Sequence, residues 1–326
     1  MPSFFRNAGS PSYGHRTKLL ISYAPDWILT IALSVAFYLL DKVDGFKREF
    51  SVSDTSLRHP YAIHERVPNT SLYVIAFVAP LVLQWVINLL TTRSLWDAHN
   101  SALGLVLSLS LAGAFTQVVK VTVGRPRPDI IDRCQPNAGT VDPPFGLSSA
   151  AICHQSDRHI LNDGFRSFPS GHSSLSFAGL TFLSLYIAGK LLLFDSRGHA
   201  PKVWLSVLPL FGAALVAVSR TMDYRHHWQD VVAGSCLGIL TAYFSYRLYY
   251  PSLSSEVAQL PFSPRIHRLD ASLPSHVHPE DSPYYHRHTG SDAEVELLQG
   301  TARRDDPAPL DQAWKQGPSV ESGLSR

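Results

Sequence analysis

Long apolar segments alternate with polar loops along the first 250 of the 326 residues. Six of these segments approach the roughly 20 residues that a helix needs to cross the hydrocarbon core of a bilayer. They are nearly free of charge and apolar on every side, which argues against the buried helices of a soluble all-helical protein. The pattern predicts six membrane-spanning helices, at residues 23–41, 71–92, 101–119, 173–194, 203–218 and 231–250.

Prolines and glycines inside these segments fit the same interpretation. Pro80 and Pro209 would be costly in a water-exposed helix, whereas neighbouring helices in a membrane satisfy the backbone groups that a proline frees. The first segment is not expected to be a cleaved signal peptide, because about twenty residues, most of them polar, precede it and no small-residue cleavage site follows. The predicted fold class is therefore all-α, a polytopic membrane protein built as a bundle of six helices.

Composition divides the chain into three parts. Residues 1–20 form a polar N-terminal tail, residues 21–250 the six-helix membrane domain, and residues 251–326 a C-terminal tail rich in Pro, Ser and His. The C-terminal tail shows no sustained periodicity, which predicts disorder. Its scattered histidines are typical of a solvated tail rather than of a metal site.

The net charge of +2 and the absence of a basic block indicate no nucleic-acid partner. Three cysteines are too few for a disulfide scaffold. Cys134 and Cys153 nevertheless share one polar loop, and the sequence leaves open a disulfide in an oxidising compartment or two free thiols.

Three polar strings occupy the ends of predicted helices. They are KVTVGRPRP at 120–128, PSGH at 169–172 and SRTMDYRHHWQD at 219–230. Successive spans run in opposite directions, so the end of the third, the start of the fourth, the end of the fifth and the start of the sixth emerge on one membrane face. We therefore expect the three strings to meet and form a single site.

The residue types in these strings favour a multiply charged oxyanion. The guanidinium groups of Arg127 and Arg220 match pairs of phosphate oxygens, and Lys120 adds a point charge. Ser170 is expected near the N-cap of the fourth helix, where free backbone N–H groups and the helix dipole favour an anion. Gly171 would let the backbone approach that anion closely, and phosphate is the natural candidate.

Two histidines and one aspartate supply the reactivity. If the sixth helix begins near Arg225, His226 and Asp230 lie one turn apart on the same helix face. Asp230 would then accept a hydrogen bond from one ring nitrogen of His226 and leave the other free to attack phosphorus. His172 would protonate the departing oxygen, and His227, rotated by about 100° around the helix, is expected to be a supporting or interfacial residue.

The three strings resemble the signature of the phosphatidic acid phosphatase type 2 (PAP2) superfamily. That pattern is Lys, six residues and Arg-Pro; then PSGH; then Ser-Arg, five residues, His, three residues and Asp, and every position is matched here. The resemblance covers roughly residues 20–250 and implies the helical core shared with vanadium haloperoxidases. TVGRPRPD and DYRHHWQDVVAG look closest to fungal-type diacylglycerol pyrophosphate and lipid phosphate phosphatases.

The resemblance implies a role for each signature residue and no cofactor or divalent metal. It implies substrates such as phosphatidate, lysophosphatidate and diacylglycerol pyrophosphate, hydrolysed through a phosphohistidine. It also implies cytosolic termini and a luminal or extracellular site, in the plasma membrane or in a vacuole, endoplasmic reticulum or Golgi membrane. The implied phosphate ligands are Lys120, Arg127, Ser170, Gly171 and Arg220, and the implied catalytic residues are His226 (nucleophile), His172 (acid) and Asp230 (orienting partner).

Alternative functions remain open at this point. A polyprenyl-diphosphate or sphingoid-base phosphate phosphatase would use the same headgroup chemistry with a different apolar groove. Soluble haloperoxidases share the oxyanion site, but six spans argue against one. A transporter or a catalytically silent phosphate-binding protein would not need His226 paired with Asp230.

Overall fold

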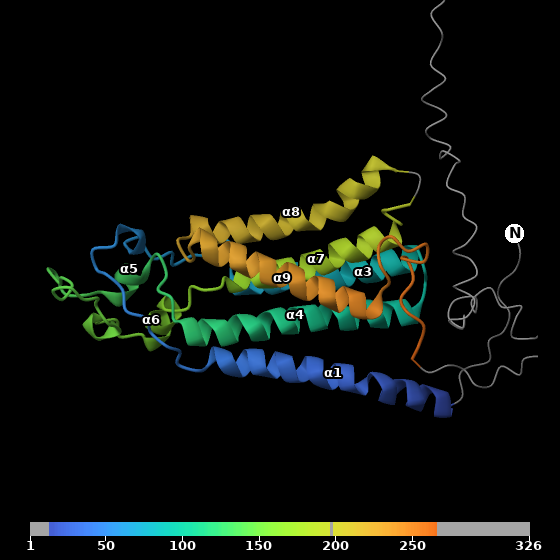
Figure 1. The fold of residues 1–326 in the computed structure, drawn as a ribbon, viewed down its shortest axis with the longest axis horizontal. Coiled ribbons are helices and arrows are strands. Elements are labelled where there is room, and N and C mark those ends of the chain that lie inside the picture. Colours follow the sequence, from blue (N-terminus) through green and yellow to red (C-terminus); the bar gives the residue numbers. More distant parts are fainter. Residues whose placement is uncertain (1–12, 196–197, 266–326) are drawn as a thin grey trace, which may run out of the picture. The chain divides into compact units, whose positions relative to one another are not determined.

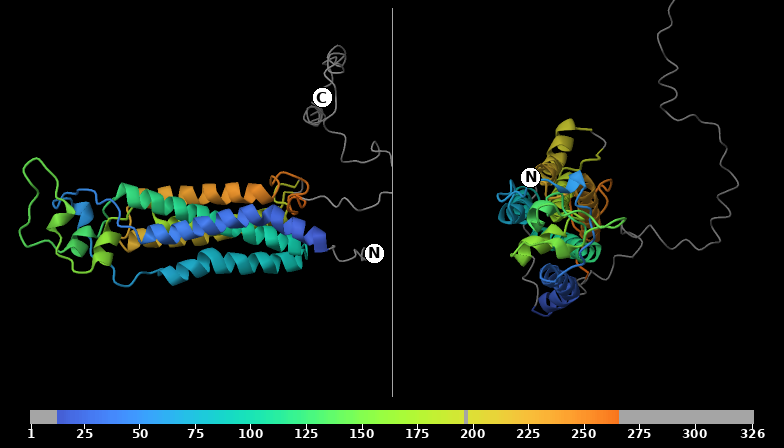
Figure 2. Two further views of the ribbon diagram at one scale, coloured as in Figure 1. Left: turned by 90° about the horizontal axis from the view of Figure 1, so that it is seen from below. Right: turned by 90° about the vertical axis from the view of Figure 1, so that its left-hand side faces the viewer.

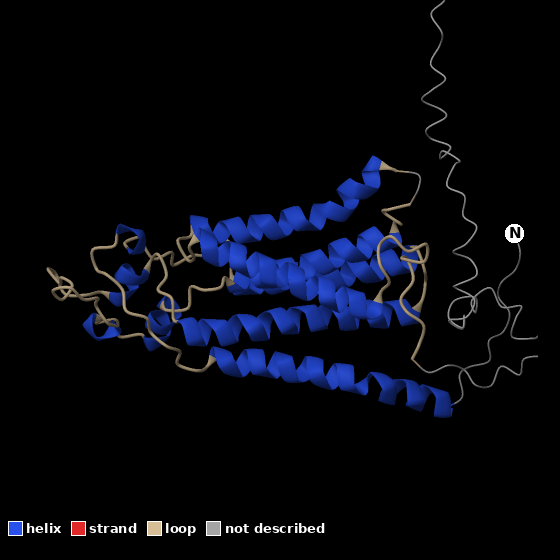
Figure 3. Ribbon diagram, in the orientation of Figure 1, coloured by secondary structure: helices blue, strands red, loops and turns tan. Residues whose placement is uncertain are grey.

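The computed structural model describes residues 13–195 and 198–265, and helices dominate these ranges (Figure 3). No strand occurs in the described ranges, where Phe50 and Ser148 form a single isolated antiparallel bridge. The predicted all-α class is therefore confirmed. Long helical stretches run side by side in Figure 1: α1 (Tyr13–Asp41), α2 (Asn69–Tyr73) continuing through η2 (Val74–Val78) into α3 (Ala79–Leu90), α4 (Leu95–Val123), α7 (Gly171–Lys190), α8 (Ala200–Met222) and α9 (Trp228–Tyr249).

Five stretches among the described residues are long and apolar enough to cross a membrane. They are Ile21–Asp41, Asn69–Leu90, Leu95–Val123, Ala200–Met222 and Trp228–Tyr249. Helix α7 is not one of them, because serines and glycines occupy many of its positions. Fourteen of its 20 residues are buried, so neighbouring helices cover it, and its membrane span stays a prediction.

Helix α7 packs against α4, α8 and α9 at the centre of the bundle (Figures 1 and 2). Small residues allow this close packing. A Cβ atom at Gly238 of α9 would lie 2.4 Å from the carbonyl oxygen of Ser174, and one at Gly179 of α7 would lie 1.8 Å from that of Ala76. Both distances are shorter than van der Waals contact, so only glycine fits at either position.

The second long stretch contains a wide π turn, η2, just before Pro80. Proline has no N–H to donate to the carbonyl four residues earlier, which is that of Ala76. A π turn is a common way for a helix to accommodate such an interruption. It falls where Gly179 of α7 approaches Ala76, and this contact brings the start of the stretch close to α7.

Residues 42–68 and 124–170 form a cap over one end of the bundle (Figure 2). The cap contains η1 (Thr55–Leu57), α5 (Ile130–Cys134), η3 (Ala150–Ile152) and α6 (Arg158–Gly164). Its apolar core includes Phe50, Leu57 and Phe165. A disulfide joins Cys134 to Cys153, which resolves the alternative that the sequence left open in favour of a bridge.

The opposite end of the bundle is closed by residues 251–265. Lys190 donates a 2.6 Å hydrogen bond to the carbonyl of Gln259, and Trp96 donates one of 3.0 Å to that of Phe262. Lys190 also forms a 2.8 Å ion pair with the buried Asp97. The boundary predicted after residue 250 therefore differs from the structure for 251–265, which packs against the helices through backbone carbonyls that accept hydrogen bonds from Lys190 and Trp96.

The N-terminal boundary also differs from the prediction, because α1 begins at Tyr13 rather than after residue 20. The remainder of the predicted tails, residues 1–12 and 266–326, lies outside the described residues.

The contact between α7 and α9 generates a stability prediction. Gly238→Ala should lower the free energy of unfolding by about 1–3 kcal/mol, because the added methyl group overpacks against the backbone of α7. Gly212→Ala in α8 is the matched control, since its Cβ atom would meet no atom closer than 3.6 Å. Thermal unfolding in detergent should show a lower midpoint for Gly238→Ala only, and equal midpoints would contradict the packing.

Candidate active site

One cavity of about 500 Å³ lies where the bundle meets the cap. It brings together residues from all three signature strings, as the sequence predicts. Ser170 and Asp230 are fully buried and do not line it. The sequence-predicted site residues that line it are Lys120, Arg127, Gly171, His172, Arg220 and His226.

The start of α7 is held beside the cavity by hydrogen bonds of Ser170. As predicted, Ser170 is the N-cap, and its side chain accepts a 3.4 Å hydrogen bond from the backbone N–H of Ser173. The backbone N–H of Ser170 donates to the carbonyl of Asp230 at 2.9 Å, so this bond ties α7 to α9. A Cβ atom at Gly171 would lie 3.1 Å from Nζ of Lys120, which places the lysine next to the first turn of α7.

His226 lies in the loop between α8 and α9, with one ring nitrogen bound to the backbone. Its Nδ1 is 2.7 Å from the carbonyl oxygen of Ser167. A carbonyl only accepts, so Nδ1 carries the proton and Nε2 keeps its lone pair. Burial, reinforced by the charges of Arg127 and Lys120, holds the pKa of His226 well below its ordinary value. The histidine is therefore neutral near pH 7 and suited to nucleophilic attack through Nε2.

The expected hydrogen bond between His226 and Asp230 is not formed. Helix α9 begins at Trp228 rather than near Arg225, so His226 precedes the helix and is not one turn from Asp230. Asp230 instead accepts hydrogen bonds from the Ser167 hydroxyl at 2.5 Å and from the backbone N–H of His227 at 3.0 Å. It also pairs with Arg125 at 2.7 Å. Asp230 thus contacts Ser167, whose carbonyl holds His226.

His227 has the supporting position that the sequence suggested. It is the N-cap of α9 and forms a capping box with Asp230. Its Nδ1 lies 3.3 Å from a carboxylate oxygen of Asp230. Its ring does not line the cavity.

His172 approaches the cavity from the first turn of α7. Its Nε2 lies 3.0 Å from the carbonyl oxygen of Val67, to which it donates, and 3.8 Å from a carboxylate oxygen of Glu65. Both partners belong to the cap segment that leads into α2. His172 therefore contacts a part of the chain outside the three signature strings.

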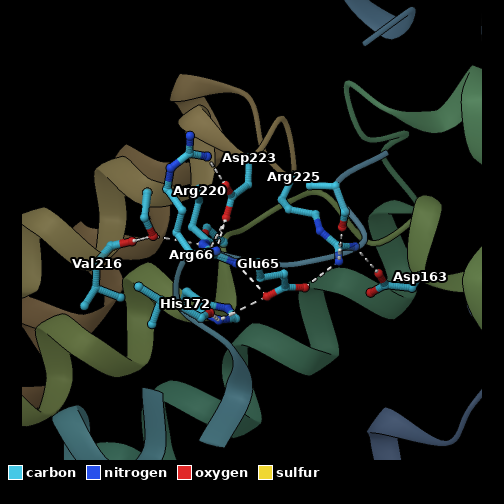
Figure 4. A network of polar contacts seen from close by, with 12 residues as sticks. Glu65, Arg66, Asp163, His172, Val216, Arg220, Asp223 and Arg225 are labelled. Carbon is cyan, nitrogen blue, oxygen red and sulfur yellow. Dashed lines mark hydrogen bonds and ion pairs between the residues drawn. The ribbon is translucent and has the colours of Figure 1, made fainter. Parts of the chain in front are cut away.

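Two carboxylates of the cap hold the arginines of the cavity (Figure 4). Glu65 lies 2.8 Å from a guanidinium nitrogen of Arg220 and 2.5 Å from one of Arg225. Asp163 lies 2.7 Å from Arg127 and 3.4 Å from Arg225. Arg225 thus contacts both carboxylates, each of which also pairs with one arginine of the signature, Arg127 or Arg220.

Neighbouring charges control the ionisation of Asp163 and Arg127. Burial alone would raise the pKa of Asp163, but the nearby charges of Arg127 and Arg133 hold it well below the ordinary value. Burial lowers the pKa of Arg127 to about 10, and Asp163 limits that decrease. Both groups are therefore charged at neutral pH, and the ion pair persists across the physiological range.

The cavity changes character along its length. Its polar part adjoins the cap, and from there it follows α4 from Lys120 to Gly113, about 10 Å at the rise of an α-helix. Phe37, Leu72 and Leu175 make this second part apolar. The arrangement suits a molecule with a charged head and an apolar body.

Several charged residues that line the cavity were not predicted from the sequence: Asp41, Glu65, Arg133, Asp163 and Arg225. Arg225 lies next to His226 inside the third string, and its position was the available signal. Glu65 and Asp163 lie in long polar loops, where no periodicity indicates which side chain turns inward. The carboxylates that line the cavity are each paired with a cation, and no group among the described residues is placed to hold a metal ion.

Comparisons with known proteins agree with the geometry. Residues 101–253 match the sequence profile of the PAP2 superfamily. A probable diacylglycerol pyrophosphate phosphatase of Schizosaccharomyces pombe is 38% identical over 252 residues, which cover 76% of this chain and 88% of the relative. Diacylglycerol pyrophosphate phosphatase 1 of Saccharomyces cerevisiae is 38% identical, with 82% and 92% covered. Lipid phosphate phosphatase 1 of Arabidopsis thaliana is 37% identical, with 76% and 75% covered. No solved structure matches.

The contact of His226 with the Ser167 carbonyl predicts a defined protonation state. At pH 6, His226 should be neutral with its proton on Nδ1, whereas a solvent-exposed histidine is mostly charged at that pH. Nitrogen-15 NMR of histidine-labelled protein measures this, with His226→Ala identifying the signal. An imidazolium signal from His226 at pH 6, or a proton on Nε2 alone, would contradict the geometry.

Proposed function

The chain belongs to the PAP2 superfamily, and from this membership we propose that it is a membrane lipid phosphate phosphatase. The proposed substrates are phosphatidate, lysophosphatidate and diacylglycerol pyrophosphate, which lose their terminal phosphate through a phosphohistidine without Mg²⁺. One observation supports this most strongly. His226 has its Nδ1 bound to a carbonyl, no described residue bonds to its Nε2, and the cavity around it is lined by five lysine and arginine side chains.

In the first step, Nε2 of His226 attacks the terminal phosphorus. A nitrogen–phosphorus bond forms while the bond from phosphorus to the lipid oxygen breaks, and the bonding electrons leave with that oxygen. Burial and the charge of Arg220 lower the pKa of His172 to about 3 in this structure, so the negative charge of the bound phosphate must raise that pKa before His172 can give a proton to the departing oxygen. Lys120, Arg127 and Arg220 stabilise the charge on the phosphoryl oxygens in the transition state.

In the second step, water completes the reaction. Its oxygen attacks phosphorus, a proton passes to His172, and the nitrogen–phosphorus bond returns its electrons to Nε2. Inorganic phosphate is released and both histidines regain their starting protonation. Asp230 acts through Ser167, whose carbonyl keeps the proton of His226 on Nδ1.

The apolar part of the cavity supports a lipid as substrate. Phe37 and Leu175 line it from α1 and α7. Tyr38 and Tyr73, which also line it, are half exposed or more, so the cavity reaches the outer surface of the bundle at α1 and α2. A phosphate group could bind near His226 while the acyl chains remain in the membrane.

We also propose that the site faces the lumen or the exterior and that the described helix ends at Tyr13 and Tyr249 face the cytosol. The disulfide between Cys134 and Cys153 supports this orientation, because structural disulfides form in oxidising compartments. It lies in the cap, next to the cavity.

Substitution of the adjacent histidines tests the nucleophile. His226→Ala should lower phosphate release from phosphatidate by at least about a thousandfold and abolish trapping of labelled phosphate on the protein. His227→Ala should retain activity within about tenfold, since that ring caps α9 instead of lining the cavity. Retention of the phosphoenzyme in His226→Ala and its loss in His227→Ala would reverse the assignment.

Chelation tests the metal requirement. Phosphatidate hydrolysis by the purified protein should keep at least about 80% of its rate in excess EDTA, because lysine and arginine side chains supply the positive charge around the phosphate. The measurement compares initial rates with and without EDTA and with Mg²⁺ restored. Loss of activity in EDTA with recovery on Mg²⁺ addition would contradict a metal-free site.

A further inference from the structure

The carboxylate of Glu65, in the cap, forms ion pairs with two arginines of the cavity at the same time. Oε2 of Glu65 is 2.8 Å from Arg220 and Oε1 is 2.5 Å from Arg225. Both guanidinium groups are buried, and all three residues line the cavity (Figure 4). Guanidinium groups bind phosphate oxygens through the same charge-assisted hydrogen bonds that they form with a carboxylate.

Each of the three guanidinium nitrogens of Arg220 already has a partner within the protein. Its Nε donates to the Ser219 hydroxyl at 3.2 Å, one terminal nitrogen pairs with Asp223 at 3.0 Å, and the other pairs with Glu65. Asp223 and Ser219 are buried and belong to the same turn at the end of α8. Glu65 is the partner that comes from the cap, and it is the more exposed of the two carboxylates.

Arg225 carries donor capacity that the protein does not use. Its Nε is buried and has no hydrogen-bond partner within the described part of the chain, and the same is true of Nε of Arg127. Both residues line the cavity, and Asp163 contacts a terminal nitrogen of each. Buried donors without a partner are costly, so these two arginines are suited to gain hydrogen bonds from a ligand that enters the cavity.

We infer that Arg225 is a further phosphate-binding residue and that Glu65 occupies, in this structure, the place of the substrate phosphate on Arg220 and Arg225. The inference rests on the proposed function, since the phosphate is that of the lipid headgroup. A phosphate dianion bound to the same two arginines would be repelled by the Glu65 carboxylate, because both are negatively charged. Phosphate binding therefore requires Glu65 to leave both arginines.

The displacement of Glu65 has a consequence for His172. Val67, two residues after Glu65, accepts the hydrogen bond from Nε2 of His172. Movement of the segment from Glu65 to Val67 would release that nitrogen. Phosphate binding and the release of the proposed general acid would then occur together, and His172 would be able to donate to the leaving oxygen only when substrate is present.

Binding of inorganic phosphate to the full-length protein in detergent tests the inference. Broadening of the phosphorus-31 NMR signal reports the dissociation constant and needs no catalysis. Arg225→Gln should raise that constant by about tenfold or more, because a charge-assisted hydrogen bond is lost. Glu65→Gln should lower it by about threefold to tenfold, because the competing charge is removed while the side-chain volume is kept.

Two residues of the same cap loop provide matched controls. Arg58→Gln removes a positive charge from a side chain that donates to the carbonyl of Val52, and Glu49→Gln removes a negative charge from an exposed position. Neither residue lines the cavity. Both variants should leave the dissociation constant within about twofold of the unsubstituted protein.

The outcomes separate the possibilities. An unchanged dissociation constant in Arg225→Gln would overturn the inference. A raised dissociation constant in Glu65→Gln would also overturn it, because Glu65 would then orient the arginines for phosphate. Circular dichroism checks the folding of each variant. If Arg225→Gln does not fold, Glu65→Gln alone tests the inference. An unchanged dissociation constant in Glu65→Gln then also contradicts it. Absence of phosphate binding to the unsubstituted protein overturns it as well. Lipid phosphate hydrolysis is assayed separately, so failure of the proposed function is recognised independently.

Discussion

Burial of several cations around one cavity is the constraint on which the site depends. Lys120 and Arg127 come from one string and Arg220 from another, and positive charges taken out of water repel one another unless carboxylates compensate them. Asp163 and Glu65 supply that compensation from the cap, and Arg225 contacts both. The cap is therefore part of the site, because its two carboxylates pair with Arg127 and Arg225 and share Arg220 with Asp223.

The position of these cations depends in turn on close packing within the bundle. Helix α7 can present Gly171 and His172 next to Lys120 only because glycines let it approach its neighbours to backbone contact. The hydrogen bond from Ser170 to the carbonyl of Asp230 then fixes the starts of α7 and α9 together. Serines and glycines occupy many positions of α7, which is not among the helices apolar enough to cross a membrane by composition. Its place at the centre of the bundle puts these residues against neighbouring helices.

Sequence alone predicted the parts of the molecule that depend on local pattern. Long apolar runs located the long helices within about ten residues at each end, and alternation of direction brought the three strings to one cavity. The partner of His226 was predicted wrongly, because the start of α9 depends on a capping box between His227 and Asp230 that excludes His226 from the helix.

Glu65 could not be predicted, since its contacts with Arg220 and Arg225 join residues about 155 positions or more apart through an irregular loop. The order of 251–265 was missed because backbone carbonyls, which carry no sequence signal, make its contacts.

We propose that the three strings form one phosphate site with His226 as the nucleophile. An experimental structure of the protein with orthovanadate, a phosphate analogue that can bond to a nucleophilic nitrogen, tests this most directly. Vanadium should bond to Nε2 of His226, with Lys120, Arg127 and Arg220 around its oxygens. Vanadium bound to His172 or His227, or held by the cap away from His226, would contradict it.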